Sequence, residues 1–206
     1  AAQHSQSLHA LVAHIPGLKV AMPSSAYEAK GLLKTAIRDN NPVVIFEDKL
    51  MYQDKAFVPD EEYLLPFGEA AILKEGSDVT LIGTSSMRQV CERAAVLLHK
   101  DGISAEVIDP RTIVPLDEHT ILNSVKKTSR AIVVDEGHQN FGTTAEIASR
   151  ISEKAFYYLD APVIRMGALD VPIPFSPVLE DITVPTAEGV AENARKIVSG
   201  ELVHGL

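Results

Sequence analysis

Short apolar runs alternate along the chain with segments that show the helical apolar period. This pattern predicts strands that alternate with helices. After residue 66, short apolar runs alternate four times with segments whose apolar residues recur at i, i+3, i+4 and i+7. The expected strands are 78–83, 104–108, 131–134 and 162–166, and the expected helices are 86–99, 118–125, 143–158 and 186–198. This order indicates βαβ units, a parallel sheet and helices on both faces of that sheet.

The strand expected at 104–108 organises the rest of the pattern because Asp109-Pro110-Arg111-Thr112 ends it. Pro110 removes a backbone donor and disfavours the helical conformation at Asp109, so the strand must finish there. Such an ending is typical of the carboxyl edge of a parallel sheet, where open α/β sheets place their ligands. An ion pair between Arg111 and Asp109 explains the same residues, so this stretch fixes the architecture and leaves the function open.

Residues 1–47 show a related but incomplete pattern. A helix is expected at 7–14, a strand at 18–22, a helix after the capping box formed by Ser25 and Glu28, and a buried parallel strand at 42–46. Two strands are too few to close a sheet, so further strands are expected upstream or on another chain. We therefore expect apolar surface to be exposed on residues 1–47, with self-association or loose packing there as the consequence.

The composition narrows the classes of function. With 46% apolar residues the chain can bury a core, and a net charge of −9 argues against nucleic acid as a main partner. No apolar run approaches the roughly 20 residues that span a bilayer. The single cysteine, Cys91, cannot form an internal disulfide, which fits a reducing compartment, and it falls on the apolar face of an expected helix.

Histidines near the start of the chain are candidates for proton transfer. His4 lies in the polar run Gln3-His4-Ser5-Gln6, where amide and hydroxyl neighbours would fix its tautomer near neutral pH. A solvated surface histidine is the alternative. His9 and His14 are five residues apart and do not share one helical face, so metal binding by the three histidines is not expected.

Residues 135–142 form a second polar stretch, between an expected strand and an expected helix. Two carboxylates, a histidine and two amides gather there, and Gly137 and Gly142 permit a tight turn. A capped βα turn explains the stretch equally well. No Gly-x-Gly-x-x-Gly, Walker or Gly-x-Ser-x-Gly sequence occurs. The residue pattern alone therefore indicates an α/β domain with a polar edge.

Several longer motifs, in a fixed order along the chain, carry a family resemblance. They are Ala2-Gln3-His4-Ser5-Gln6, His14-Ile15-Pro16-Gly17-Leu18-Lys19-Val20, Ala29-Lys30-Gly31-Leu32-Leu33, Ala36-Ile37-Arg38-Asp39-Asn40-Asn41-Pro42, Pro66-Phe67-Gly68-Glu69-Ala70, Val107-Ile108-Asp109-Pro110-Arg111-Thr112, Leu159-Asp160-Ala161-Pro162 and Asp170-Val171-Pro172-Ile173-Pro174-Phe175. With them the chain resembles the β subunit of the thiamine-diphosphate-dependent decarboxylase component of 2-oxo acid dehydrogenase complexes. The pyruvate, branched-chain and acetoin dehydrogenases share this subunit.

The resemblance implies a fold and a division into domains. Residues 1–47 resemble the C-terminal part of a pyrimidine-binding domain, 48–66 a linker, and 67–206 a transketolase C-terminal-type domain. That domain is expected to be α/β, with three αβα layers around a mostly parallel sheet. Its role in the family is subunit assembly and docking to the acyltransferase core.

The resemblance also implies partners and a cofactor. Two α and two β chains would form a heterotetramer that binds thiamine diphosphate with magnesium at α/β interfaces. The α subunit would hold the diphosphate, and the β chain the aminopyrimidine. A second β subunit and a lipoyl acyltransferase core complete the expected partners. The location would be the bacterial cytoplasm or the mitochondrial matrix.

Individual residues take roles by the same resemblance. His4 matches the family histidine that manages protons around the bound intermediate and during its transfer to a lipoyl group. The activating glutamate and the pyrimidine pocket would lie upstream, so this chain alone is expected to be inactive. Asp39 and Asn41 match part of a potassium site, with an ordinary helix end as the alternative. Asp160 matches an acidic position that faces the acyltransferase core, with a plain surface aspartate as the alternative.

Two other readings stay open. The chain could be a non-catalytic α/β assembly or binding module. A transketolase or deoxyxylulose-phosphate synthase fragment shares the expected fold but fits the His-Ser-Gln and Asp-Pro-Arg-Thr motifs less well. The substrate cannot be read from the sequence, although the motifs lean towards the pyruvate or acetoin branch.

Overall fold

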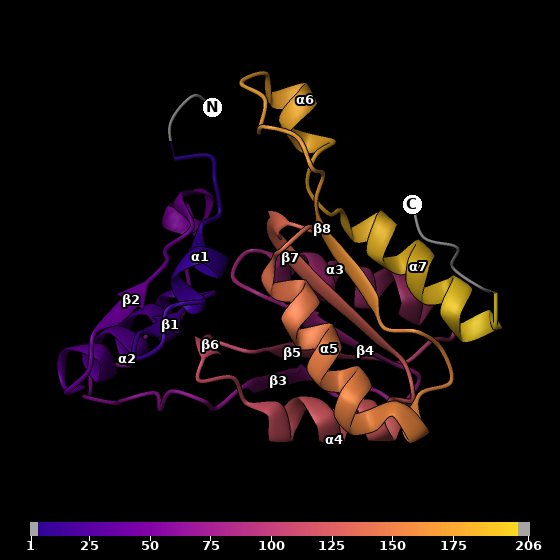
Figure 1. The fold of residues 1–206 in the computed structure, drawn as a ribbon, viewed down its shortest axis with the longest axis horizontal. Coiled ribbons are helices and arrows are strands. Elements are labelled where there is room, and N and C mark those ends of the chain that lie inside the picture. Colours follow the sequence, from indigo (N-terminus) through magenta and orange to yellow (C-terminus); the bar gives the residue numbers. More distant parts are fainter. Residues whose placement is uncertain (1–3, 202–206) are drawn as a thin grey trace.

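A computed structural model describes residues 4–201 of the chain. Its centre is a five-stranded sheet in the order β3-β5-β4-β7-β8 (Figure 1). The strands are β3 (Ala71–Lys74), β4 (Val79–Gly83), β5 (Ala105–Asp109), β7 (Ala131–His138) and β8 (Ile164–Ala168). All neighbouring strands run parallel except β3, which pairs antiparallel with β5 at one edge. The mostly parallel sheet expected from the sequence is thus confirmed.

The order of the strands creates a reversal at the middle of the sheet. From β4 the chain passes to β5 on one side, and it later returns to β7 on the other side of β4. Connections that leave a strand in opposite directions open a crevice at the carboxyl ends of the two strands concerned. Here that crevice lies where β4 and β7 end.

Helices cover both faces of this sheet. α3 (Met87–Lys100) and α7 (Ala187–Ser199) pack on one face, and α4 (Glu118–Thr128) and α5 (Thr143–Ala155) on the other. Successive strand residues point to opposite faces, so Leu81 faces α3 and α7 while Ile82 faces α4 and α5. Because both faces are buried there, the central strand β4 and the first half of β7 appear in the sequence as mostly apolar runs.

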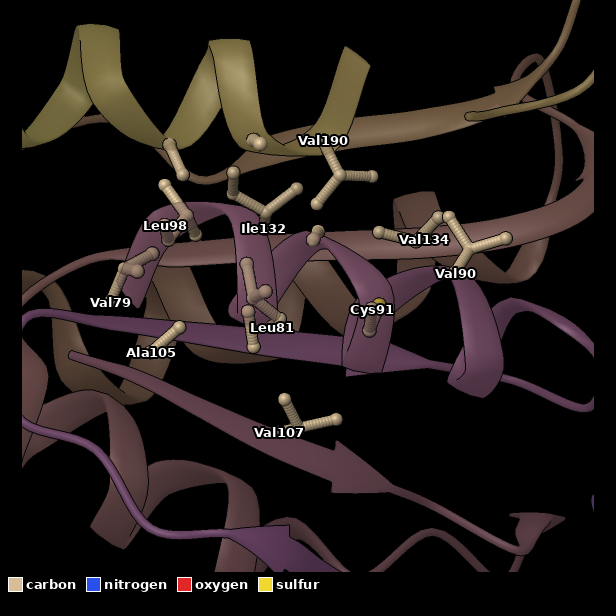
Figure 2. Packing of buried hydrophobic residues seen from close by; sticks show 14 of the residues in the cluster. Val79, Leu81, Val90, Cys91, Leu98, Ala105, Val107, Ile132, Val134 and Val190 are labelled. Carbon is tan, nitrogen blue, oxygen red and sulfur yellow. The ribbon is translucent and has the colours of Figure 1, made fainter. Parts of the chain in front are cut away.

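The core beneath α3 and α7 contains the only cysteine of the sequence. Figure 2 shows Cys91 on α3 among Leu81, Val90 and Val134, with Val190 of α7 above the same strands. Cys91 is fully buried, and that burial raises the pKa of its thiol. The prediction that Cys91 is a core residue is confirmed.

A smaller three-stranded sheet lies beside the first (Figure 1). It contains β1 (Lys19–Ala21) between β2 (Val43–Ile45), which is parallel to it, and β6 (Thr112–Val114), which is antiparallel. β6 follows directly on β5, so the C-terminal part of the chain supplies a strand to the sheet of the N-terminal part. Under the proposed division at 1–47, 48–66 and 67–206, the third part therefore contributes a strand to the sheet of the first part.

Two helices accompany the small sheet. α1 (His9–Ala13) precedes β1, and α2 (Ala26–Ile37) joins β1 to β2. The Ser25 side chain caps α2 and accepts a hydrogen bond from the Glu28 backbone at 3.3 Å, as the capping box predicts. Large apolar side chains are exposed in this part, which confirms the expected apolar surface: Leu8, Leu11, Ile15, Leu33 and Ile37.

Some elements differ from the sequence prediction. β2 is parallel as expected, but it is half-buried rather than buried. Four short elements were not predicted, since three to five residues are too few to show a period: β3, β6, α6 (Pro177–Asp181) and the 3-10 turn η1 (Lys49–Gln53). The helix expected at 143–158 ends as an α-helix at Ala155, and its last three residues form the 3-10 turn η2 (Phe156–Tyr158). β7 also continues past Val134 into the polar stretch, as far as His138. Among the helices within residues 4–201, none is long and apolar enough to cross a membrane.

Candidate functional site

The carboxyl ends of two pairs of parallel strands, β1 with β2 and β4 with β7, lie at one cavity of about 680 Å³. Residues that follow β1 and β2 line it, as do residues at the ends of β4 and β7: Met22, Phe46, Glu47, Asp48, Ser85 and Glu136. The chain before α1 forms a further wall and includes His4. The structure therefore places His4 at the sheet edge where the sequence analysis expected a ligand site.

His4 has an unusual backbone conformation and an exposed side chain. Its φ is 57°, in the left-handed region, and Ser85 across the same cavity has a φ of 48°. L-residues adopt this region at a cost of about 1–3 kcal/mol, and such residues gather at functional sites. Within residues 4–201, no hydrogen bond or ion pair holds the His4 ring. The backbone of the segment must therefore place the ring in the cavity.

The segment that follows His4 is attached to the polar end of β7. Gln6 Oε1 lies 3.2 Å from His138 Nε2, and the other ring nitrogen of His138 is 2.8 Å from the Leu169 carbonyl. Ser7 donates a hydrogen bond to Glu136 Oε1 at 2.8 Å. The sequence alone did not distinguish whether the polar stretch at 135–142 is a site or a plain turn. In the structure, residues of this stretch hold the segment that carries His4.

The deepest of these attachments is a buried pair of His9 and Asp135. His9 Nε2 lies 2.7 Å from Asp135 Oδ2, and each side chain is only 1% exposed. A Cβ on Gly137 would lie 3.2 Å from the His9 ring, so glycine leaves room for this approach. Thr84 also donates to Asp135, at 2.9 Å. The pair joins α1 to β7 in the interior of the molecule.

The pKa values of the pair shift in opposite directions. Burial lowers the pKa of His9, but the hydrogen bond and charge of Asp135 outweigh burial and leave the pKa raised. Burial raises the pKa of Asp135, but the hydrogen bond from His9 outweighs it and leaves the pKa lowered. The charged forms of both residues are favoured together. Sequence reasoning missed this pair because spacing placed His9 only in relation to the neighbouring histidines.

Carboxylates dominate the chemistry of the cavity around His4. Asp48 accepts from the Leu50 backbone at 2.8 Å with Oδ1, while its buried Oδ2 has no hydrogen-bond partner among residues 4–201. Burial, followed by the charge of Asp48, raises the pKa of Glu136. Glu47 and Glu180 also line the cavity, and so does the positively charged Lys49. An acidic wall with an unused carboxylate oxygen suits a ligand that donates hydrogen bonds, such as an amine, rather than a phosphate.

A second buried polar cluster ties α2 to the end of β5. The Arg111 guanidinium donates to Glu28 at 3.0 Å, whereas Asp109 accepts from the Arg111 backbone at 2.8 Å and from Ser24. The expected ion pair of Arg111 with Asp109 is therefore wrong: Glu28, on another element, takes the guanidinium. Burial and the Glu28 charge raise the pKa of Asp109 to about 8. Burial opposes ionisation of Glu28, but hydrogen bonds from Ser24 and Arg111 outweigh it and lower that pKa.

This cluster predicts a pH dependence of stability. Asp109 has a folded-state pKa above its ordinary 3.8, so it stabilises the fold fully below pH 3.8, and this contribution is lost as pH rises through about 8. We expect the free energy of unfolding of the wild-type chain to fall between pH 3.8 and about pH 8, and the Asp109→Asn variant to show a shallower fall. Urea titrations at several pH values measure both slopes. Equal slopes for the two proteins would contradict the assignment.

Asp39 and Asn41, the expected part of a potassium site, do lie together. Asp39 accepts hydrogen bonds from the Asn41 backbone at 2.8 Å and from the Asn41 side chain at 3.0 Å. Its other oxygen pairs with Lys19, whose hydrogen bond lowers the pKa of Asp39 to about 2. Within residues 4–201, no group of three or more His, Cys, Asp or Glu residues could hold a metal ion. The potassium site stays a proposal.

Asp160, the expected docking residue, lies at the surface between η2 and β8. Its carboxylate is 3.1 Å from the Arg130 guanidinium, and its side chain is 59% exposed. This geometry fits both an exposed docking charge and an ordinary surface ion pair. Its role in docking stays a proposal.

The family of the chain follows from a match that covers more than half of it. Residues 68–190 match the family model described as "Transketolase, C-terminal domain". The chain belongs to this family. Residues 1–55 match a second model, "Transketolase, pyrimidine binding domain". The fold class expected from the sequence is confirmed by both matches, and the cavity around His4 lies where residues of the two matched regions meet.

Individual relatives of this transketolase-family chain are dehydrogenase subunits. It is 48% identical over 190 residues to the acetoin:2,6-dichlorophenolindophenol oxidoreductase subunit beta of Bacillus subtilis, covering 92% of this chain and 56% of the relative. It is 47% identical over 197 residues to the pyruvate dehydrogenase E1 component subunit beta of Rickettsia felis, covering 96% and 60%. The mitochondrial subunit of Dictyostelium discoideum is 46% identical over 200 residues, covering 95% and 56%. The resemblance stated from the motifs is confirmed.

A solved structure shares the fold. The chain superposes on a protein described as a split gene transketolase, inactive beta4 tetramer, with a TM-score of 0.79 and 26% identity, covering 93% of this chain and 60% of that one. This chain spans between half and two thirds of the length of these relatives. A pyrimidine-binding domain, together with such relatives, implies dependence on thiamine diphosphate.

Proposed function

We propose that this chain is part of the β subunit of a thiamine-diphosphate-dependent dehydrogenase. The reaction would be oxidative decarboxylation of a pyruvate-type 2-oxo acid, or cleavage of acetoin, with acyl transfer to a lipoyl group. The observation that carries the proposal is the position of His4, in a cavity where two pairs of parallel strands end and the two family regions meet. The names of the acetoin and pyruvate relatives support the substrate class.

The lining of the cavity fits part of the implied cofactor. An aminopyrimidine donates hydrogen bonds, and the unpartnered Asp48 Oδ2 offers an acceptor in the cavity wall. A diphosphate does not suit a wall of carboxylates, so magnesium and the diphosphate would be held by the α subunit. When bound, thiamine diphosphate supplies an electron sink that stabilises a carbanion. Potassium, with Asp39 and Asn41 as two of its ligands, belongs to the same proposal.

The residues of this chain would handle protons and position the site. An imidazole such as that of His4 can serve as a general acid or base, and it lines the cavity without a competing hydrogen bond from residues 4–201. The segment held by Glu136 and His138 keeps that ring at the sheet edge. The C-terminal domain would contact the α subunit, the second β subunit and, through Asp160, the lipoyl acyltransferase core. The site of action would be the bacterial cytoplasm or the mitochondrial matrix.

Turnover by an assembled enzyme tests the proposal. A form of this chain extended to the length of its relatives is produced together with an α-type partner and is assayed with pyruvate, branched-chain 2-oxo acids and acetoin. We expect turnover of pyruvate or acetoin that requires thiamine diphosphate, and no turnover by the 206-residue chain alone. A tetramer that assembles but turns over none of these substrates would favour the non-catalytic assembly module instead.

A further inference from the structure

We propose that Glu136 is a positioning residue for His4, acting through Ser7. The inference rests on the proposed function, in which His4 transfers protons. Glu136 lies near the carboxyl end of β7 and lines the cavity that His4 enters. Glu136 belongs to the polar stretch at 135–142, for which the sequence alone indicated either a site or a plain turn. The contacts of Glu136 indicate that this stretch positions the segment with His4.

Both oxygens of the Glu136 carboxylate bind a serine. Ser7 donates to Oε1 at 2.8 Å, and Ser86 donates to Oε2 at 3.2 Å. Ser86 is the residue before α3, so this second bond fixes the carboxylate against a helix that packs on the sheet. Ser7 is three residues after His4 in the chain. Glu136 therefore connects a rigid part of the fold to the segment that carries the catalytic candidate.

The His4 ring depends on that segment for its position. Within residues 4–201 no side chain holds the ring, and its backbone is in the left-handed region. Beyond Ser7, the chain is fixed again where His9 meets Asp135 in the interior. Loss of the Ser7 anchor would remove the bond that ties this segment to the end of β7 beside the one made by Gln6. A displacement of about 1 Å at a reacting group lowers the rate by about 10²-fold.

The experiment is a double-mutant cycle in the assembled, full-length enzyme. It compares the wild type, Glu136→Ala, His4→Ala and the double variant, with Glu136→Gln as the conservative change. Glu153→Gln is the matched control, because Glu153 is an exposed glutamate outside the cavity that accepts a hydrogen bond from Ser149 on its own helix. We expect Glu136→Ala to lower kcat by about 10²-fold with little change in KM. Glu136→Gln retains an acceptor for Ser7 and should recover most of the loss.

The cycle separates positioning from direct catalysis. If Glu136 acts through His4, Glu136→Ala causes no further loss in the His4→Ala background. An equal, additive loss in that background would overturn the proposal, since Glu136 would then act on the substrate itself. Wild-type rates in Glu136→Ala would overturn it as well.

Hydrogen exchange gives a readout that does not depend on turnover. In Glu136→Ala, we expect amides of the peptide 4–9 to exchange faster while peptides of α3 and α5 keep their wild-type rates. Unchanged exchange of the peptide 4–9 would overturn the positioning role. If the wild-type enzyme shows no turnover that depends on His4, the proposed function fails, and the exchange result still decides whether Glu136 holds this segment.

Discussion

Replacing Asp135 with alanine is expected to lower the free energy of unfolding by about 3–5 kcal/mol, because it leaves His9 buried without its partner. Both side chains are 1% exposed, so bulk solvent does not reach the unpaired His9. The change also removes the acceptor for Thr84 and for the Gly137 backbone. His9→Ala should destabilise the chain by a similar amount, and the double variant by less than the sum, since each change breaks the same contact.

The pH dependence of this pair follows from the two pKa shifts. The pKa of His9 is raised above 6.5, so its contribution is full below pH 6.5 and is lost as pH rises through the folded-state value. The pKa of Asp135 is lowered below 3.8, so its contribution is present above pH 3.8 and is lost as pH falls through the folded-state value. The pair therefore stabilises the fold most between these limits.

Urea unfolding at about pH 6, followed by circular dichroism, measures these effects. Asp101→Ala is the control, because Asp101 pairs with Arg195 at the surface and such a pair contributes about 0–1 kcal/mol. If Asp135→Ala is no less stable than Asp101→Ala, the buried pair does not hold α1 to β7.

The sequence predicted the four parallel strands of the five-stranded sheet, but not its edge strand β3, because the central strands are buried on both faces. β4 and β5 appear as apolar runs bounded by turn residues, and the apolar stripe of α3 repeats with the helical period. Asp109-Pro110 marked the end of β5 for a local reason, since proline acts on its own neighbours. Local signals of this kind fixed the sheet edge at which the cavity lies.

Contacts between distant residues could not be predicted in this way. His9 and Asp135 are 126 residues apart, and Arg111 reaches Glu28 across 83 residues. Spacing along one helix or strand carries no information about such pairs. A signal was present nonetheless: His9 stands beside apolar positions of a short helix, and Asp135 directly follows a buried apolar run. Two titratable residues at core positions need partners, and each could have been suggested for the other.

His4→Ala in the assembled, full-length enzyme is expected to lower turnover by about 10²–10⁴-fold, which is the usual contribution of a positioned acid–base group. His4 is exposed and its ring makes no hydrogen bond within residues 4–201, so the variant should fold and assemble as the wild type does. His99→Ala is the matched control, because His99 is an exposed histidine at the end of α3, outside the cavity.

The turnover of these three proteins with thiamine diphosphate and the preferred substrate is the most direct test of the cavity as an active site. We expect His4→Ala to lose most of the turnover and His99→Ala to keep the wild-type rate. Equal turnover by His4→Ala and the wild type would show that the proton chemistry lies elsewhere and that His4 is an ordinary surface histidine.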